Sequence, residues 1–240
     1  MPSNLPSVVN VGQINACLFR VARLDSDCTP LGGNCSGYVT AGLATFTSTP
    51  DIEEGVRVEP KNACGQFVYT YEAPSIVKRH NLSGELYFFD PEAAFILFGG
   101  EVILGGAGSD FSGDAIGWAS PNYTDAPSNG VYLEIITKSI AEAAGDCVSE
   151  DTSFPAYTGH IWGKAKLVIG DRTFEEDAAR LTFTGTATGN PNLYDGPWND
   201  WPGDAYIRNT PYQWIGYSQD EFDAILADVA PGCQDLPAAS

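Results

Sequence analysis

The fold class of this chain is decided most clearly by the stretch Arg180-Leu-Thr-Phe-Thr-Gly-Thr-Ala-Thr188, in which apolar and polar side chains alternate. Leu181, Phe183 and Ala187 fall on one face, and the threonines fall on the other. A period of two is typical of a β-strand with one face buried and one face in solvent. The stretch Val131-Tyr-Leu-Glu-Ile-Ile-Thr-Lys138 alternates in the same manner, so both stretches are predicted to be half-buried strands.

Further segments show similar strand patterns. They are Ala16–Leu24, Tyr38–Ser48, Gly65–Glu72, Ile76–Phe89 and His160–Ile169. Clusters of Gly, Pro, Asn and Asp separate them, and these residues favour turns. A succession of strands and turns predicts a mainly β fold, with sheets packed as a sandwich or a barrel-like structure.

One flanking helix is well signalled between Asp90 and Gly99. Asp90 can cap it, Pro91 suits the first helical position, and Gly99 can end it. The residues between them are apolar nearly all round, which predicts a largely buried helix. A weaker amphipathic pattern predicts a second helix over Ser218–Ala230.

No internal repeat and no convincing linker divides the chain. We therefore expect a single β domain over residues 1–240, with a core over about 10–189 and a long aromatic C-terminal extension over about 190–240. One hairpin loop is unusually long: Thr49–Cys64 is polar, acidic and lies between two strand patterns. Loops beyond ~12–15 residues are uncommon unless they are functional or disordered.

The charge balance excludes several classes of function. The chain carries 31 Asp and Glu against 12 Lys and Arg, for a net charge of −19. Binding to nucleic acid or to anionic lipid needs clustered Lys and Arg, so neither is expected. The longest apolar run, near Ala93–Phe98, is far shorter than the ~18–20 residues of a membrane-spanning helix. The first residues show neither a basic region nor an apolar region of a secretory signal.

The cysteine and histidine content predicts neither a metal site nor a cofactor. The six cysteines form no C-x-x-C pair, and the chain has only two histidines, His80 and His160. Without a secretory signal, we expect mostly free thiols, as in a protein made in the cytosol. The alternatives are a Cys17–Cys28 or a Cys28–Cys35 disulfide.

Enzyme chemistry has weak support in the sequence. Neither histidine lies in the setting of a catalytic triad, and no phosphate loop or nucleophile motif occurs. Paired carboxylates beside aromatic rings can hydrolyse glycans, and the acids that fit this pattern are Glu53, Glu54, Asp195, Asp200 and Asp204, near Trp198 and Trp201. Because the chain has 31 acids, some such pairs arise by chance, and this pattern alone does not identify a glycan hydrolase. A carbohydrate-active or carbohydrate-binding β-sandwich is kept as the alternative prediction.

Several short motifs follow one another along most of the chain. They are Gly12-Gln-Ile-Asn-Ala-Cys-Leu-Phe-Arg-Val-Ala-Arg-Leu-Asp25, Gly37-Tyr-Val-Thr40, Glu53-Glu-Gly55, Lys61-Asn-Ala-Cys-Gly65, Tyr87-Phe-Phe-Asp-Pro-Glu92 followed by Gly99-Gly100, Gly170-Asp-Arg-Thr-Phe174, Gly189-Asn-Pro-Asn192 and Gly196-Pro-Trp-Asn-Asp-Trp-Pro202. By their order and spacing, the chain resembles the major tail tube proteins of phages with long, non-contractile tails, particularly those that infect actinobacteria.

The resemblance implies packed β-sheets flanked by a helix, in subunits that assemble as stacked hexameric rings. Sheets of the six subunits would line a lumen that conducts the DNA genome into the host without binding it specifically. The implied partners are further copies of the chain and the tape measure, terminator and distal tail proteins. The protein would belong to the virion tail, assembled in the bacterial cytoplasm, with no enzyme activity. An acidic lumen suits this role because it repels phosphate.

Two interfaces follow from this comparison. The loop Thr49–Cys64 corresponds to the segment that reaches a neighbouring ring, with the predicted contact residues Ile52, Glu53, Glu54, Val56, Arg57, Val58, Glu59 and Lys61. Aromatic residues are favoured at interfaces, which makes a second predicted interface of Tyr194, Trp198, Trp201 and Trp214. For the tryptophans, the alternative is an intramolecular plug over one end of a sheet.

Overall fold

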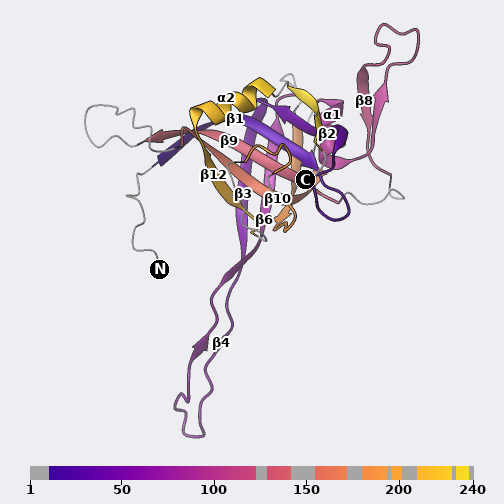
Figure 1. Cartoon of the computed structure of the whole chain (residues 1–240). Helices are drawn as coiled ribbons and strands as arrows, with labels where there is room; N and C mark the ends of the chain where they lie inside the picture. The colour runs from indigo at the N-terminus through magenta and orange to yellow at the C-terminus, as the bar shows by residue number, and fades with distance from the viewer. Residues whose placement is uncertain are drawn as a thin grey trace.

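The computed structural model describes residues 11–122, 129–141, 155–171, 180–193, 196–201, 210–228 and 231–237. Within these residues the chain forms thirteen strands and two helices (Figure 1). The prediction of a mainly β fold is confirmed. In this part of the chain, neither helix has the length and apolar character needed to cross a membrane.

Nine strands form one antiparallel sheet, which is the body of the molecule. Eight follow the order β13–β2–β1–β9–β10–β11–β6–β3, and β12 pairs with β10. Their bounds are β1 Val11–Arg23, β2 Gly33–Thr40, β3 Leu43–Glu53, β6 Ile76–Leu86, β9 Val131–Ala141, β10 Tyr157–Ile169, β11 Leu181–Thr188, β12 Gln213–Tyr217 and β13 Gly232–Leu236. β12 and β13 belong to the predicted C-terminal extension, so that segment supplies two strands to the sheet.

Both predicted helices are present. In α1 (Pro91–Phe98), the Asp90 carboxylate accepts a 2.9 Å hydrogen bond from the first turn, and the Gly99 N–H donates to the last turn at 2.8 Å. α2 (Gln219–Asp228) follows Ser218, whose hydroxyl and N–H both donate to the carboxylate of Glu221. The fold class therefore includes two helices rather than one flanking helix.

The central strands are buried on both faces. In β9, Leu133 and Ile135 pack in an apolar cluster with α1, whereas Tyr132 and Ile136 pack in a second cluster with α2. Because successive side chains of a strand point to opposite faces, the two clusters lie on opposite sides of the sheet. The alternation in Val131–Lys138 predicted a half-buried strand, and this was wrong since both faces of β9 are covered.

Two hairpins project from this body in different directions (Figure 1). The first leaves β3, carries β4 (Arg57–Val58) and β5 (Tyr71–Glu72), and returns to β6. The second follows α1 and consists of β7 (Glu101–Leu104) and β8 (Ala115–Ala119). The first hairpin extends to the bottom of Figure 1 and the second to the upper right.

Two of the strand predictions differ from the structure, and one hairpin was not predicted. Tyr38–Ser48 is two strands, because the chain turns between β2 and β3. Gly65–Glu72 was predicted as a strand, but every residue in it is exposed, and only its last two residues form a strand. The second hairpin was not predicted, since its glycines resemble loop residues.

A disulfide joins Cys35 to Cys233 and so links β2 to its neighbour β13. Cys17, Cys28 and Cys64 are free, and Cys147 lies outside the described residues. The predicted alternatives Cys17–Cys28 and Cys28–Cys35 are therefore wrong. Sequence spacing could not find the correct pair, because 198 residues separate the two cysteines and only the β2–β13 pairing brings them together.

Candidate interaction surfaces

The first hairpin, residues 54–75, forms a long arm that leaves the body of the protein (Figure 1). Each limb of about eleven residues spans roughly 35 Å at ~3.3 Å per residue. The base of the arm is fixed by the last register pair of the sheet, Glu53 opposite Ile76. Lys78 pairs with Glu53 at 2.7 Å, and Arg79 pairs with Asp51 at 2.8 Å. The arm thus continues from the regular antiparallel pairing of β3 with β6.

The arm holds its shape through local contacts. Gly55 passes so close to the other limb that a Cβ atom would lie 1.6 Å from the carbonyl oxygen of Ala73. At the tip, the Asn62 side chain accepts hydrogen bonds from two backbone N–H groups, those of Cys64 and Gln66. This side-chain turn is a conformation that Asn favours. The turn at the tip is therefore held in a defined conformation by side-chain hydrogen bonds.

The arm exposes apolar side chains that the monomer leaves in water. Those on or beside the arm with the largest exposure are Ile52, Val56, Val58, Phe67, Val68, Tyr69, Tyr71, Ile76 and Val77. An isolated two-stranded ribbon is marginally stable in water, and a contiguous exposed apolar surface indicates an interaction site. The surface of the arm is therefore suited to contact with another molecule.

The predicted contact residues fall on this arm or at its base. Ile52 and Glu53 belong to β3, and Val56 to Lys61 lie on the outgoing limb. Arg57 already donates to Glu59 at 2.8 Å, and Lys61 lies over the ring of Phe67 at 4.8 Å. The sequence prediction placed the loop over Thr49–Cys64. In the structure the loop starts later, because Thr49–Glu53 pair in β3, and it includes the returning limb.

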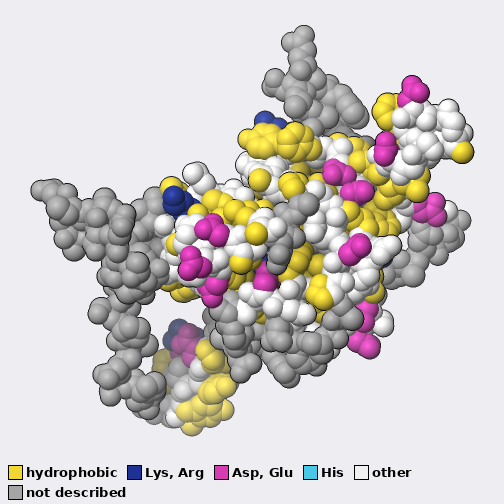
Figure 2. Space-filling view, turned by 45° about the horizontal axis from the view of Figure 1, so that its top comes forward, with side chains coloured by type: hydrophobic (Ala, Val, Ile, Leu, Met, Phe, Trp, Pro, Cys, Tyr) yellow, Lys and Arg dark blue, Asp and Glu magenta, His cyan; other side chains and the backbone are white. Residues whose placement is uncertain are grey.

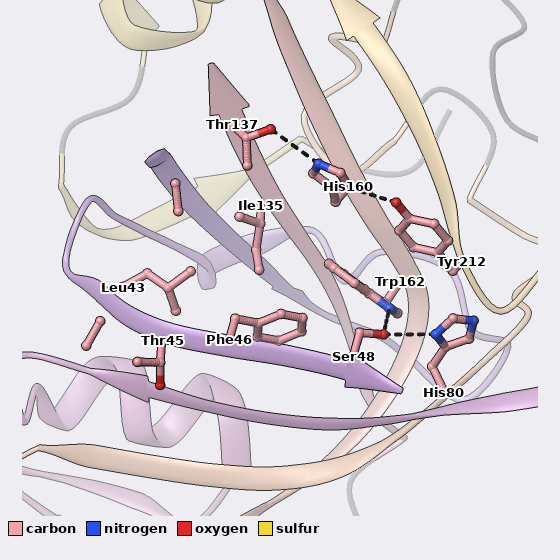
Figure 3. Close-up of a pocket in the computed structure, with 12 residues that line it drawn as sticks. Leu43, Thr45, Phe46, Ser48, His80, Ile135, Thr137, His160, Trp162 and Tyr212 are labelled. Carbon is pink, nitrogen blue, oxygen red and sulfur yellow. Dashed lines mark hydrogen bonds between the residues drawn. The ribbon is translucent and has the colours of Figure 1, made fainter. Parts of the chain in front are cut away.

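A pocket of about 460 Å³ lies between β3 and the strands β9 and β10 (Figure 3). Its aromatic wall contains Phe46, Trp162 and Tyr212, with centroids of Phe46 and Trp162 4.7 Å apart. His160 donates or accepts at 2.7 Å with the Tyr212 hydroxyl, and His80 does so at 2.9 Å with Ser48.

Both histidines of the chain line this pocket. Burial lowers the pKa of His80 and of His160, so both imidazoles are neutral at pH 7. None of the twelve lining residues is a carboxylic acid. The pocket can therefore hold a neutral apolar or aromatic group, but it does not offer the pair of carboxylates that glycan hydrolysis uses.

On the opposite face of the sheet, a buried ionic cluster is centred on Arg20. Its guanidinium donates to Glu134 at 2.6 and 2.9 Å and also pairs with Asp200. The hydroxyls of Tyr132 and Tyr217 donate to Glu134 at 2.9 and 2.8 Å. Arg20 and Glu134 are fully buried. The two facing carboxylates outweigh burial and raise the pKa of Arg20, so it stays charged.

The tryptophans predicted at an interface are separated by the fold. Trp201 is 6% exposed and packs 5.9 Å from the Tyr132 ring, while Trp198 covers Arg20 at 4.7 Å. In both cases the contact is within the chain. Trp214 on β12 is 61% exposed and remains available to another molecule. Tyr194, the remaining predicted aromatic, lies outside the described residues, as do Asp195 and Asp204.

Acids outnumber bases among the charged side chains of the surface in view (Figure 2). Figure 2 shows Asp and Glu side chains spread over the face in view, with few Lys and Arg among them. Within the described residues, no group of three or more His, Cys, Asp or Glu side chains could hold a metal ion. No protein-family model matches the chain, and no curated protein matches it in sequence.

Proposed function

We propose that this chain is a structural subunit that polymerises through its arm, as stacked hexameric rings that form a phage tail tube. The observation that carries the proposal is the arm itself, residues 54–75, which exposes Val56, Phe67, Val68 and Tyr69 to solvent. A monomer gains nothing from this ribbon, because its apolar side chains pack against no core. A neighbouring ring that buried them would stabilise the assembly.

The reach of the arm allows contact with another copy of the chain. The arm leaves one end of the sheet and reaches beyond the body of its own subunit (Figure 1). If it contacts a different surface on the next copy, the interface is heterologous, and repeated contacts build a filament. A tail tube is such an assembly, and the resemblance in motif order over most of the chain points to the same function.

The charge supports the proposed passage of DNA. A net charge of −19 gives a surface from which phosphate is repelled, so the genome would slide through a lumen of this protein without binding. Under this proposal the protein acts in the virion tail and assembles in the bacterial cytoplasm. Its partners are copies of itself and the tape measure, terminator and distal tail proteins.

Negative-stain microscopy of the purified protein tests the proposal. We expect sixfold rings and tubes. The matched variant replaces residues 54–75 with Asn-Gly, a two-residue turn that suits the register pair Glu53–Ile76. This variant should fold and should form no tubes. If the wild-type protein stays monomeric at high concentration, the proposal fails. If the shortened protein still forms long tubes, the arm is not the inter-ring contact.

The second candidate function is carbohydrate binding, which the pocket beside Trp162 favours through its aromatic rings and hydroxyl groups. Sugars stack on aromatic faces, and the neutral histidines can hydrogen-bond hydroxyls. Titration of soluble glycans with Trp fluorescence as the readout separates the two functions, with Trp162→Phe as the matched control. Saturable binding by a protein that never assembles would favour this second function.

A further inference from the structure

We propose that the second hairpin, residues 101–119, is the surface on which the arm of the next copy docks. The inference rests on the proposed function and deepens it by naming the partner surface. The two hairpins project to opposite sides of the body in both views (Figures 1 and 2). Head-to-tail stacking of copies therefore brings the second hairpin of one subunit toward the arm of the next.

The second hairpin has the same unpaired character as the arm. β7 and β8 pair only with each other among the described residues, so each keeps one free edge. Ile103, Leu104, Phe111 and Ile116 are 48 to 62% exposed. Such a ribbon offers backbone groups and apolar side chains to a second strand pair, and the arm offers both as well.

The hairpin is held firmly at its base, as a docking surface must be. The indole N–H of Trp118 donates to the Gly99 carbonyl at 2.8 Å, and its ring packs edge-on against Phe98 of α1. Gly100 adopts φ +89°, where a Cβ atom would lie 2.2 Å from the Ala119 carbonyl oxygen. These contacts fix the angle at which the hairpin leaves α1.

The second hairpin and the distal part of the arm carry net charges of opposite sign. The second hairpin carries Glu101, Asp110 and Asp114 with no Lys or Arg. These carboxylates are exposed and make no ion pair with any described residue. By contrast, residues 56–71, the distal part of the arm, carry Arg57 and Lys61 against one acid, Glu59.

The positive charge of the distal arm is unusual in a chain that is acidic overall, which favours an acidic partner surface for it. Two copies of a chain with net charge −19 repel each other over most of their surfaces. Lys61, near the arm tip, makes no ion pair among the described residues and is free to meet a facing carboxylate. Charge complementarity of this kind selects the register and partner surface of an interface.

Charge reversal tests the docking. Glu101→Lys, Asp110→Lys and Asp114→Lys together should lower the fraction of protein in tubes by about tenfold or more, because like charges would then face each other. Adding Arg57→Glu and Lys61→Glu to the same chain should restore assembly. The matched control, Asp27→Lys, Asp171→Lys and Asp220→Lys, makes the same change in net charge at other exposed acids and should assemble at least as well as wild type.

A mixing experiment does not depend on those substitutions. One variant has residues 54–75 replaced by Asn-Gly, and the other has residues 103–117 replaced by Asn-Gly, which keeps the pair Val102–Trp118. Neither should form tubes alone, but a mixture should form stacks of two rings that do not extend. Circular dichroism checks that both fold.

The outcomes separate the two proposals. Wild-type protein without rings or tubes overturns the proposed function. Wild-type tubes together with normal tubes from the variant lacking residues 103–117 overturn the docking inference alone, since the arm then binds elsewhere. Loss of tubes in the triple charge reversal without rescue by the arm reversal also overturns the charge pairing.

Discussion

The buried cluster around Arg20 and the exposed arm use the same residue types in opposite ways. In the cluster, Glu134 accepts hydrogen bonds from Arg20, Tyr132 and Tyr217, and none of the partners of its carboxylate is water-exposed. On the arm, Arg57 and Glu59 pair in solvent, and tyrosine rings stand free of any core. Charges and aromatics in the body therefore stabilise the fold, whereas on the arm they are available for association. The comparison predicts where a substitution affects folding and where it affects assembly.

The largest expected effect is on the buried cluster. Arg20→Met should lower the free energy of unfolding by about 3–5 kcal/mol, because it leaves Glu134 as a buried charge without its partner. Urea unfolding followed by fluorescence measures the change. The matched control is Arg180→Met, which breaks an exposed pair with Glu85 and should cost about 0–1 kcal/mol. If both variants lost the same free energy of unfolding, the contrast between the buried and the exposed ion pair would be wrong.

Removal of the disulfide comes next. Cys233→Ser should lower stability by about 2–4 kcal/mol under oxidising conditions, because the bond closes a very long loop in the unfolded chain. The same substitution should have little effect in the presence of reductant. Thiol titration in denaturant without reductant should detect Cys17, Cys28 and Cys64 but neither Cys35 nor Cys233. Detection of all six thiols would show that the bond does not form.

A smaller effect on stability is expected when a fall in pH protonates the two histidines of the pocket. Burial lowers the pKa of His80 and His160, so each binds a proton more readily in the unfolded chain than in the folded one. Their contribution to stability is complete above the ordinary histidine pKa of about 6.5 and is lost as the pH falls through the lower folded value. The melting temperature should drop on acidification from pH 7. His160→Gln should reduce this pH dependence, and an unchanged profile would refute the assignment.

The smallest effect on folding is expected at the arm. Val68→Ser with Tyr69→Ser should change the free energy of unfolding by no more than about 0.5 kcal/mol, since both side chains are already in solvent. The same variant should assemble poorly, which microscopy and sedimentation measure. Phe183→Ser, at a buried position, is the comparison and should destabilise the fold. Marked destabilisation by the arm variant would mean that the arm packs on its own subunit.

Local structure could be predicted from the sequence wherever its pattern was strong. The alternation in Arg180–Thr188 correctly predicted the buried face of β11, and the signals at Asp90, Pro91 and Gly99 placed α1. The sequence also identified most of the outgoing limb of the arm, since a long polar segment between strands stands out. These features depend on neighbours a few residues apart, so a short stretch of sequence contains the needed information.

Contacts between segments far apart in the sequence could not be predicted and follow from the three-dimensional fold. Nothing near Arg20 in the sequence indicates that it pairs with Glu134 and Asp200, and nothing near Cys35 indicates Cys233. Asn190 is fully buried and donates to the carbonyls of Cys28 and Gly163, which its sequence neighbours do not indicate. The second hairpin was missed for a related reason: its glycines favour loops locally, and its strands are supported by α1 at the base. Pairings of this kind depend on which strands become neighbours, and that choice is made by packing of the whole chain around its two apolar clusters.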